Sequence, residues 1–407
     1  MTTFESIADT YSQGIEGLTT KSGLVQLATE LKHLSLEARE VLPVSYLLSD
    51  AADLRTFVDE FRLQAAVNMI QVLLTSHKLI AKIHQFSYAS PMSTLLIEPG
   101  VLQLAMRACR FYIIQQTSVD ESNFEWSPTN NSLERYLQLA YLGLTGDQWK
   151  ELLSVSQRCN DHNFHHQEPF PQRKINSKDT LRVLQLHFIL QGILRVNRCL
   201  LSRHHRHNIW IIKAAEGSKG KGINISDSLE SILAMESDLS TRVAQRYIET
   251  PLLLRLHGEE FKFDLRIWVL VLSYHPLEAY VYNNIYGRRC SDPYSLDRTQ
   301  FQNSFVHLTN YSLQKLSTLQ TISNSLKMKF KSLMMSSKVN HADELLLDHE
   351  EITGLVDGND KSGFRQWDAY TWPTIFSHIR NLLKMSAQSV VHRSKSFELL
   401  GKLHFIL

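Results

Sequence analysis

A glycine- and lysine-rich segment carries the strongest chemical signal in this sequence. Residues 209–225 read IWIIKAAEGSKGKGINI, so an expected strand ending near Lys213 runs into a loop that carries Gly217, Lys219, Gly220, Lys221 and Gly222. Glycines let backbone N–H groups approach an anion closely, and lysines supply mobile positive charge. The segment therefore predicts a loop that binds phosphates. The alternative is a solvent-exposed basic hairpin, because short motifs of this kind also match by chance.

A second candidate is a stripe of ionisable residues further along the chain. In the segment KFDLRIWVLVL (residues 262–272), a strand with a period of two would place Lys262, Asp264 and Arg266 on one face and apolar residues on the other. A polar stripe within a strongly apolar strand favours a binding or catalytic site. The alternative is an exposed sheet face on which opposite charges pair, each pair contributing about 0 to 1 kcal/mol.

The elements that must position these residues change in character along the chain. In residues 1–203 apolar residues recur with helical spacing, which predicts a mostly helical N-terminal region. Short apolar bursts separated by Gly, Asp and Ser predict strands over residues 204–315. Residues 316–407 are expected to hold a helical insertion and the last portion of the sheet region. The sequence therefore predicts an α+β protein with mixed β-sheets in its second half.

The composition argues against several classes of protein. The chain has 407 residues, of which 43% are apolar, enough for more than one core. Its 43 basic and 41 acidic residues give a net charge of +2, which does not indicate a nucleic-acid partner. The amino terminus shows no signal-peptide pattern, no apolar run reaches the length of a bilayer span, and the cysteines form no C-x-x-C pair. We therefore expect a cytoplasmic protein without a membrane partner.

Six ordered blocks in the second half of the chain resemble tubulin tyrosine ligase and its relatives, the tubulin glutamylases and glycylases, which are ATP-grasp enzymes. The blocks are WIIK…GSKGKGI (residues 210–223), QRYIETPLLL (245–254), KFDLRIWVLV (262–271), RRCSDPYSL (288–296), FVHLTNYSLQK (305–315) and FELLG (397–401). Six blocks in one order are far more specific than a single motif. The first 200 residues show no comparable match. The resemblance implies an ATP-grasp fold, in which a nucleotide lies between two small sheets, with the final portion incomplete.

The resemblance also implies roles for individual residues. The ATP phosphates are expected to contact Lys213 beneath a covering loop that contains Gly217, Lys219, Gly220 and Gly222. The strand bordering the adenine is expected to contain Gln245, Arg246, Tyr247 and Ile248. Lys262, Asp264 and Arg266 are expected to face the ribose and phosphates, and Thr309 and Asn310 are expected to lie beside the phosphates or the acceptor. The expected catalytic residues are Arg266, Arg288 and Asn310. Arginines and lysines suit this chemistry because they stabilise the negative charge that develops as ATP activates a carboxylate.

The implied function is an ATP-dependent ligase that acts on tubulin. ATP would convert a carboxylate on the acidic tubulin tail into an acyl phosphate, which the amine of a free amino acid then attacks. Segments such as HPLEAYVY and DPYSL are similar to glycylases and HLTNYS to glutamylases, so glycine, glutamate and tyrosine all stay open. We expect a monomer whose partners are tubulin or microtubules and a free amino acid. Its expected location is the cytoskeleton, with a cilium or flagellum included.

Two departures from the family pattern concern the reacting carboxylate and the metal. Asn283 stands where family members commonly have an arginine, although Arg288 matches a second family arginine. After FELLG the family continues with an aspartate two residues past the glycine and later a Glu-x-Asn strand, which hold Mg²⁺. Here Gly401 is followed by Lys402 and Leu403, and the chain ends six residues after that glycine. Because Mg²⁺ requires oxygen ligands, the alternative expectation is an inactive, truncated family member that binds nucleotide or tubulin.

Two histidine-rich segments give weaker signals. Residues 159–166 (CNDHNFHH) could form a zinc site, but no second pair of ligands is evident, so a solvated loop is expected. Residues 203–207 (RHHRH) would either attract an acidic tubulin tail or form a solvated helix end. Neither segment therefore predicts a resident metal.

Overall fold

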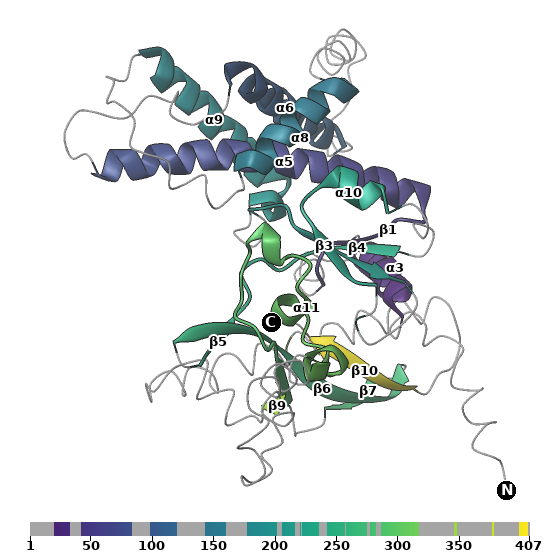
Figure 1. The fold of residues 1–407 in the computed structure, drawn as a ribbon. Coiled ribbons are helices and arrows are strands. Elements are labelled where there is room, and N and C mark those ends of the chain that lie inside the picture. Colours follow the sequence, from purple (N-terminus) through teal and green to yellow (C-terminus); the bar gives the residue numbers. More distant parts are fainter. Residues whose placement is uncertain are drawn as a thin grey trace, which may run out of the picture.

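The structure is a computed structural model of the chain. It describes residues 20–32, 42–83, 98–119, 143–159, 177–201, 206–215, 220, 222–235, 242–256, 258–274, 277–281, 286–316, 346–347, 377 and 399–405. The long helices gather at one end of the molecule, and two β-sheets with the shorter helices occupy the rest (Figure 1). This arrangement confirms the predicted α+β class. The division of the chain at residues 203 and 315 stays a prediction.

The helical layer contains four long helices that share an apolar core in the described part of the chain. They are α5 (Ala51–Ile83), α6 (Pro99–Val119), α8 (Gly146–Cys159) and α9 (Ser177–Val196), followed by the 3-10 helix η4 (Arg198–Leu201). Buried residues such as Met69, Leu152 and Ile193 join them. Thr145 and Gln148 cap α8 reciprocally, because each side chain accepts a hydrogen bond from the other residue's backbone N–H. None of the helices in the described ranges has the length and hydropathy of a membrane span.

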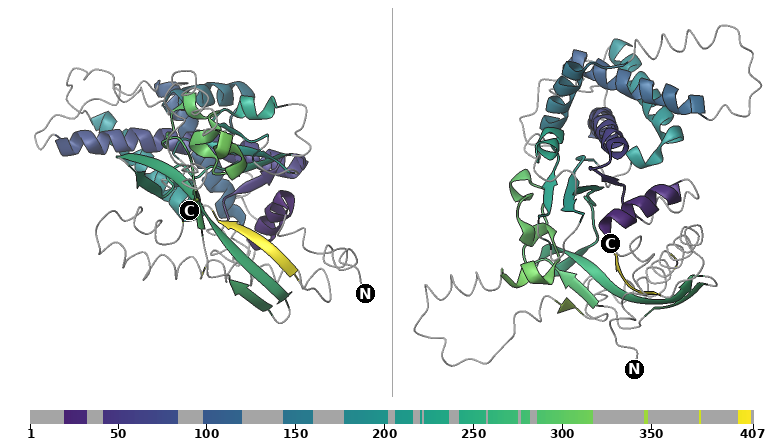
Figure 2. Two further views of the ribbon diagram at one scale, coloured as in Figure 1. Left: turned by 60° about the horizontal axis from the view of Figure 1, so that its bottom comes forward. Right: turned by 90° about the vertical axis from the view of Figure 1, so that its right-hand side faces the viewer.

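A four-stranded antiparallel sheet, the first sheet, lies beneath α5. Its strands follow the order β1 (Ser45–Leu47), β4 (Arg242–Arg246), β2 (Trp210–Ala214) and β3 (Asn224–Ser226). One face packs against α5 and the short helix α10 (Leu229–Leu233) through residues that include Tyr46, Phe57 and Trp210. Helix α3 (Lys21–Lys32) lies beside β1 and β4 (Figure 2). The mostly helical region before residue 204 therefore also supplies an edge strand to this sheet.

The second sheet is organised around the long strand β6 (Glu259–Tyr274). The partners of β6 are β5 (Leu253–Leu256), β7 (Leu277–Val281), β8 (Tyr286–Arg289) and β10 (Leu399–Phe405), and β8 also pairs with β9 (Leu346–Leu347). Figure 2 shows β10 beside β6, although these strands are far apart in the sequence. All described pairings are antiparallel, so the prediction of mixed sheets is wrong for these residues. Connections as short as residues 275–276, between β6 and β7, allow only antiparallel neighbours.

A smaller apolar cluster covers the other face of the first sheet. It contains Ile209, Ile211, Ile225, Tyr247, Phe301 and Leu308. The 3-10 helix η7 (Arg298–Gln300) precedes Phe301, and the short helix α11 (Ser304–His307) precedes Leu308 and contacts β6. This cluster therefore lies on the side of the first sheet that faces β6, which is also the side of the candidate site.

Candidate functional site

Lys213 and Gln245 lie on the face of the first sheet that α5 does not cover. Lys213 is on β2 and Gln245 on β4, and the antiparallel register places the two side chains diagonally on one face. Nζ of Lys213 donates a hydrogen bond of 2.6 Å to Oε1 of Gln245. Burial, followed by the charges of Lys262 and Lys21, lowers the pKa of Lys213 from 10.5 to about 8. Ile248 is half-buried just beyond the end of β4.

The glycine-rich loop lies against the segment that contains Asn310. Two predicted site residues of this loop, Gly217 and Lys219, lie outside the described residues. Gly220 and Gly222 have φ values of 78° and 68°, which side chains with a Cβ disfavour. A Cβ on Gly220 would lie 2.5 Å from Cδ1 of Leu313 and 3.2 Å from Oδ1 of Asn310. The structure therefore brings two predicted parts of the site, the loop and the Thr309–Asn310 segment, into contact.

The predicted ionisable stripe on β6 meets Arg288 of β8. Nη2 of Arg266 lies 3.1 Å from Oδ2 of Asp264, and Arg288 binds the same carboxylate through Nε, at 2.9 Å from Oδ1, and through Nη2. Nη2 of Arg288 also lies 3.5 Å from Oγ1 of Thr309. The residues between the members of the stripe are apolar and buried. We call Asp264, Arg266 and Arg288 the Asp264 cluster.

The Asp264 cluster places two arginines on one largely buried carboxylate. Burial raises the pKa of Asp264 from 3.8 to about 6, although Arg288, Thr309 and Lys262 all act in the opposite direction. Arg266 and Arg288 both contact this one carboxylate, and Lys262 contributes a third positive charge nearby. Cationic side chains gathered in this way favour the binding of an anion. Phosphate and carboxylate oxygens suit it best, since arginines bind them with strong charge-assisted hydrogen bonds.

Lys262 is buried beside the cluster and is held by Tyr247. Its Nζ donates a hydrogen bond of 2.8 Å to the Tyr247 hydroxyl and lies 4.2 Å from the centroid of that ring. The same hydroxyl lies 2.8 Å from Nδ1 of His307. Burial lowers the pKa of Lys262 to about 8 and the pKa of His307 to about 4, so the imidazole is neutral at neutral pH. A second lysine with weakened protonation thus faces the site.

The sequence prediction missed three residues that support the site. His307 belongs to the FVHLTNYSLQK block, which could have identified it, because the block was already tied to the phosphates. Glu249 is buried and accepts backbone N–H groups just before β2. Ser45 accepts a hydrogen bond of 2.9 Å from Nε2 of Gln245, although 200 residues separate the two. No local signal marks Ser45, since the contact depends on the pairing of β1 with β4.

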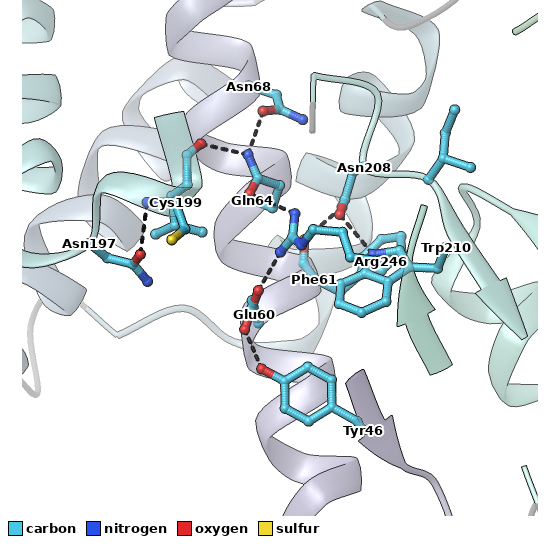
Figure 3. A network of polar contacts seen from close by, with 12 residues as sticks. Tyr46, Glu60, Phe61, Gln64, Asn68, Asn197, Cys199, Asn208, Trp210 and Arg246 are labelled. Carbon is cyan, nitrogen blue, oxygen red and sulfur yellow. Dashed lines mark hydrogen bonds and ion pairs between the residues drawn. The ribbon is translucent and has the colours of Figure 1, made fainter. Parts of the chain in front are cut away.

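The side chain of Arg246 points away from the other predicted residues. It is 3% exposed and lies on the α5 face, where it pairs with Glu60 and donates a hydrogen bond of 2.9 Å to Oε1 of Gln64. Its guanidinium group lies 4.7 Å from the ring centroid of Trp210 (Figure 3). Successive side chains of a strand face opposite sides of the sheet, so Arg246 and its neighbour Gln245 separate. The structure does not bring this side chain to the candidate site.

The described residues offer phosphate ligands but not a magnesium site. Among them no group of three or more His, Cys, Asp or Glu side chains could hold a metal ion. The carboxylate of Asp264 is bound by Arg266 and Arg288. Mg²⁺ requires several oxygen ligands in near-octahedral geometry. These residues therefore fit the phosphates of a nucleotide and do not fit Mg²⁺, and we assign no chemical step to the metal.

Comparison with known families gives a match that covers the candidate site. A family model described as "Tubulin-tyrosine ligase family" matches residues 148–401, which is more than half of the chain. The matched range contains Lys213, Lys262 and the Asp264 cluster. It does not contain Ser45, which lies before it. The family match therefore covers the cationic part of the site but not β1.

Individual relatives are tubulin-modifying enzymes by name. The chain is similar to "Tubulin glycylase 3E" of Tetrahymena thermophila, with 32% identity over 200 residues that cover 48% of this chain and 12% of that protein. It is similar to "Tubulin monoglycylase TTLL3" of Homo sapiens, with 28% identity over 318 residues that cover 72% and 36% of the two chains. It is also similar to "Tubulin polyglutamylase TTLL5" of Homo sapiens, with 38% identity over 108 residues that cover 26% of this chain and 8% of that protein. The chain thus spans well under half the length of these relatives.

Proposed function

This chain belongs to the tubulin-tyrosine ligase family, and on that basis we propose that it acts as an ATP-dependent ligase that joins an amino acid to a carboxylate of the acidic tubulin tail. The relatives to which it is similar are named as tubulin glycylases and a tubulin polyglutamylase. Glycine and glutamate are therefore candidate substrates, and the family name adds tyrosine. In this proposal the protein works on the microtubule cytoskeleton.

The observation that carries the proposal is the presence of cationic side chains on both sheets at the candidate site. Lys213 projects from the first sheet, and Lys262 and the Asp264 cluster belong to the second. The charge of Lys262 contributes to the lowered pKa of Lys213, which supports a common location for these cations. A polyphosphate is the kind of ligand that would neutralise such a region, and a bound anion would restore the charge of both lysines.

The proposed reaction gives the lysines and the arginines of the site different roles. A carboxylate is a poor electrophile, so the γ-phosphoryl group of ATP is transferred to it, giving an acyl phosphate and ADP. The amine of the amino acid then attacks the acyl carbon, forms the amide bond and releases phosphate. We assign phosphate binding to Lys213 and Lys262, and charge stabilisation during transfer to Arg266, Arg288 and Asn310.

A second candidate function is binding of nucleotide or tubulin without ligation. Leu403 stands two residues past Gly401, where the family resemblance implies an aspartate, and in β10 it pairs with Ile267 of β6. A leucine side chain offers no ligand to Mg²⁺. The cationic groups would still bind a nucleotide in that case, so ATP binding and amino-acid transfer must be measured separately.

The first experiment measures ATP binding by calorimetric titration of the full 407-residue chain. Lys213→Ala is expected to weaken binding by about tenfold to a hundredfold, because a hydrogen bond to a charged group contributes about 1.5 to 3 kcal/mol. Lys150→Ala is the matched control, since the Lys150 side chain is 84% exposed on α8. Unchanged ATP affinity in Lys213→Ala would overturn the site.

The second experiment measures transfer of radiolabelled glycine, glutamate or tyrosine to tubulin in the presence of ATP. Transfer of one amino acid that depends on Lys213 supports the ligase and identifies its substrate. ATP binding without transfer of any of the three supports the binding protein instead. Transfer to bulk cell protein in preference to tubulin would contradict tubulin as the acceptor.

A further inference from the structure

A chain of hydrogen bonds runs from the N-terminal edge strand to Lys213. Oγ of Ser45 donates to the carbonyl oxygen of Pro43 at 2.8 Å and accepts from Nε2 of Gln245 at 2.9 Å. Oε1 of Gln245 in turn accepts from Nζ of Lys213 at 2.6 Å. In the register of β1, β4 and β2, Ser45 lies directly opposite Gln245, and Lys213 lies diagonally beyond it. All three side chains therefore share the face of the sheet that holds the candidate site.

The chemistry of the two ends determines the direction of every bond in this chain. A carbonyl oxygen such as that of Pro43 can only accept a hydrogen bond, so the Ser45 hydroxyl must donate its proton to that oxygen. The hydroxyl oxygen then accepts a hydrogen bond from the NH₂ group of the Gln245 amide. An ammonium group can only donate, so the carbonyl oxygen of Gln245 must face Lys213. One orientation of the Gln245 amide satisfies both Ser45 and Lys213. Ser45 thus holds that amide with its carbonyl toward the lysine.

We propose that Ser45 is a positioning residue for the nucleotide site, which orients Gln245 so that Gln245 holds the ammonium group of Lys213 in place. The inference rests on the proposed nucleotide site and extends it to a residue before the family-matched range 148–401. Without the hydroxyl, Lys213 alone orients the amide of Gln245, and the amide loses the second hydrogen bond that keeps its carbonyl toward the lysine. An amide NH₂ group turned toward the ammonium would repel it.

The location of Ser45 separates this role from that of its neighbours on β1. Tyr46 and Leu48 pack into the apolar core under α5, and the backbone of β1 makes the sheet contacts. The Ser45 side chain takes no part in either, although the residue is only 5% exposed. Its removal is therefore expected to affect the site more than the fold.

The test compares Ser45→Ala, Ser45→Thr and the control Ser49→Ala in the full chain. Ser49 is the same residue type and lies exposed in the turn that follows β1. Ser45→Ala is expected to weaken ATP binding about threefold to tenfold, the range that corresponds to one hydrogen bond. Ser45→Thr, which keeps the hydroxyl, should restore the affinity, and Ser49→Ala should bind like the wild type. Thermal unfolding of each variant checks that the fold is retained.

A readout specific to positioning is the pH at which ATP affinity falls. Lys213 is faced by Gln245 on β4, by Lys262 on β6 and by Lys21 on α3, and its pKa is already lowered. Loss of the oriented carbonyl should lower that pKa further, so the affinity of Ser45→Ala should decline at a lower pH than that of the wild type. In a Lys213→Met background, Ser45→Ala should have no further effect on affinity or on its pH midpoint.

The outcomes separate this inference from the proposed function. If the wild type does not bind ATP, or if Lys213→Met binds it equally well, the proposed function itself fails. If Lys213→Met weakens binding but Ser45→Ala behaves like Ser49→Ala, only the role of Ser45 is overturned. The role is also overturned if Ser45→Ala has the same effect with and without Lys213, because that result indicates a general structural defect.

Discussion

Two groups of charged side chains that include largely buried arginines, one between α5 and the first sheet and one on the second sheet, differ in what surrounds the arginines. Arg246, under α5, meets the carboxylate of Glu60, the amide of Gln64 and the face of Trp210 (Figure 3). Glu60 is also bound by the Tyr46 hydroxyl. Every strong charge there has a partner within the protein, so this group needs no ligand.

The Asp264 cluster instead brings several cations to one carboxylate. Two arginines share the carboxylate of Asp264, and Lys262 lies beside them. The balanced group at Arg246 joins α5 to the first sheet, whereas the Asp264 cluster is the group that we propose binds an anion. Burial alone does not distinguish them, since both are largely removed from solvent. The difference lies in the neighbouring side chains, which supply a carboxylate and an amide to Arg246 and a further cation, Lys262, to the Asp264 cluster.

The largest expected effect comes from breaking the balanced group. Arg246→Met should lower the free energy of unfolding by about 3 to 5 kcal/mol, because it leaves a partly buried carboxylate without its cation. Chemical denaturation measures this loss. ATP affinity of the folded variant should stay at the wild-type value, since the Arg246 side chain faces away from the site. Adding Glu60→Leu should recover much of the stability, and a second loss of equal size would contradict an ion pair.

A substitution beside the Asp264 cluster should instead weaken ligand binding without loss of stability. Lys262→Met deletes a buried charge whose pKa is lowered to about 8. ATP affinity should fall about tenfold to a hundredfold, the contribution of one charged hydrogen bond. The free energy of unfolding should be unchanged or higher, because the cost of burying an ammonium group is removed. Titration calorimetry and denaturation together test this, and an unstable variant would assign Lys262 to the fold.

The pH dependence of stability and of ATP affinity should follow the two buried lysines of the candidate site and not Arg246. Burial lowers the pKa of Lys213 and of Lys262 from 10.5 to about 8, so the unfolded chain binds more protons between these pH values. Stability of the ligand-free protein should therefore rise over that interval, and ATP affinity should fall. Denaturation and titration across the interval measure both trends. The variant Lys213→Met/Lys262→Met should lose them, whereas Arg246→Met should keep them.

The smallest expected effect belongs to an exposed ion pair. Arg255 and Glu260 lie 2.8 Å apart, with side chains 76% and 46% exposed. Arg255→Ala should change stability by no more than about 1 kcal/mol, since solvent screens such pairs. It should leave ATP affinity unchanged. A large loss of stability in chemical denaturation would show that balanced charge matters on the surface as well as in the interior.

Sequence reasoning identified most of the cationic residues because they lie in recognisable local patterns. The period-two stripe on β6 was predicted correctly, as the contact between Asp264 and Arg266 indicates. The antiparallel pairing of all described strands was not predicted, since apolar bursts do not specify their partners. The zinc alternative at residues 160–166 falls outside the described residues, as does the position of Asn283. The roles assigned to individual site residues stay predictions.

The sequence alone determined that this chain is α+β, that it resembles a known family of ligases and that its lysines and arginines are concentrated in ordered blocks. These properties depend on local spacing, which is readable along the chain. Only the tertiary structure decided that Arg246 and Gln245 serve opposite faces of one sheet, and that Ser45 reaches Gln245 from 200 residues away. Both facts follow from strand pairing and register, which bring distant segments together and which no local pattern encodes.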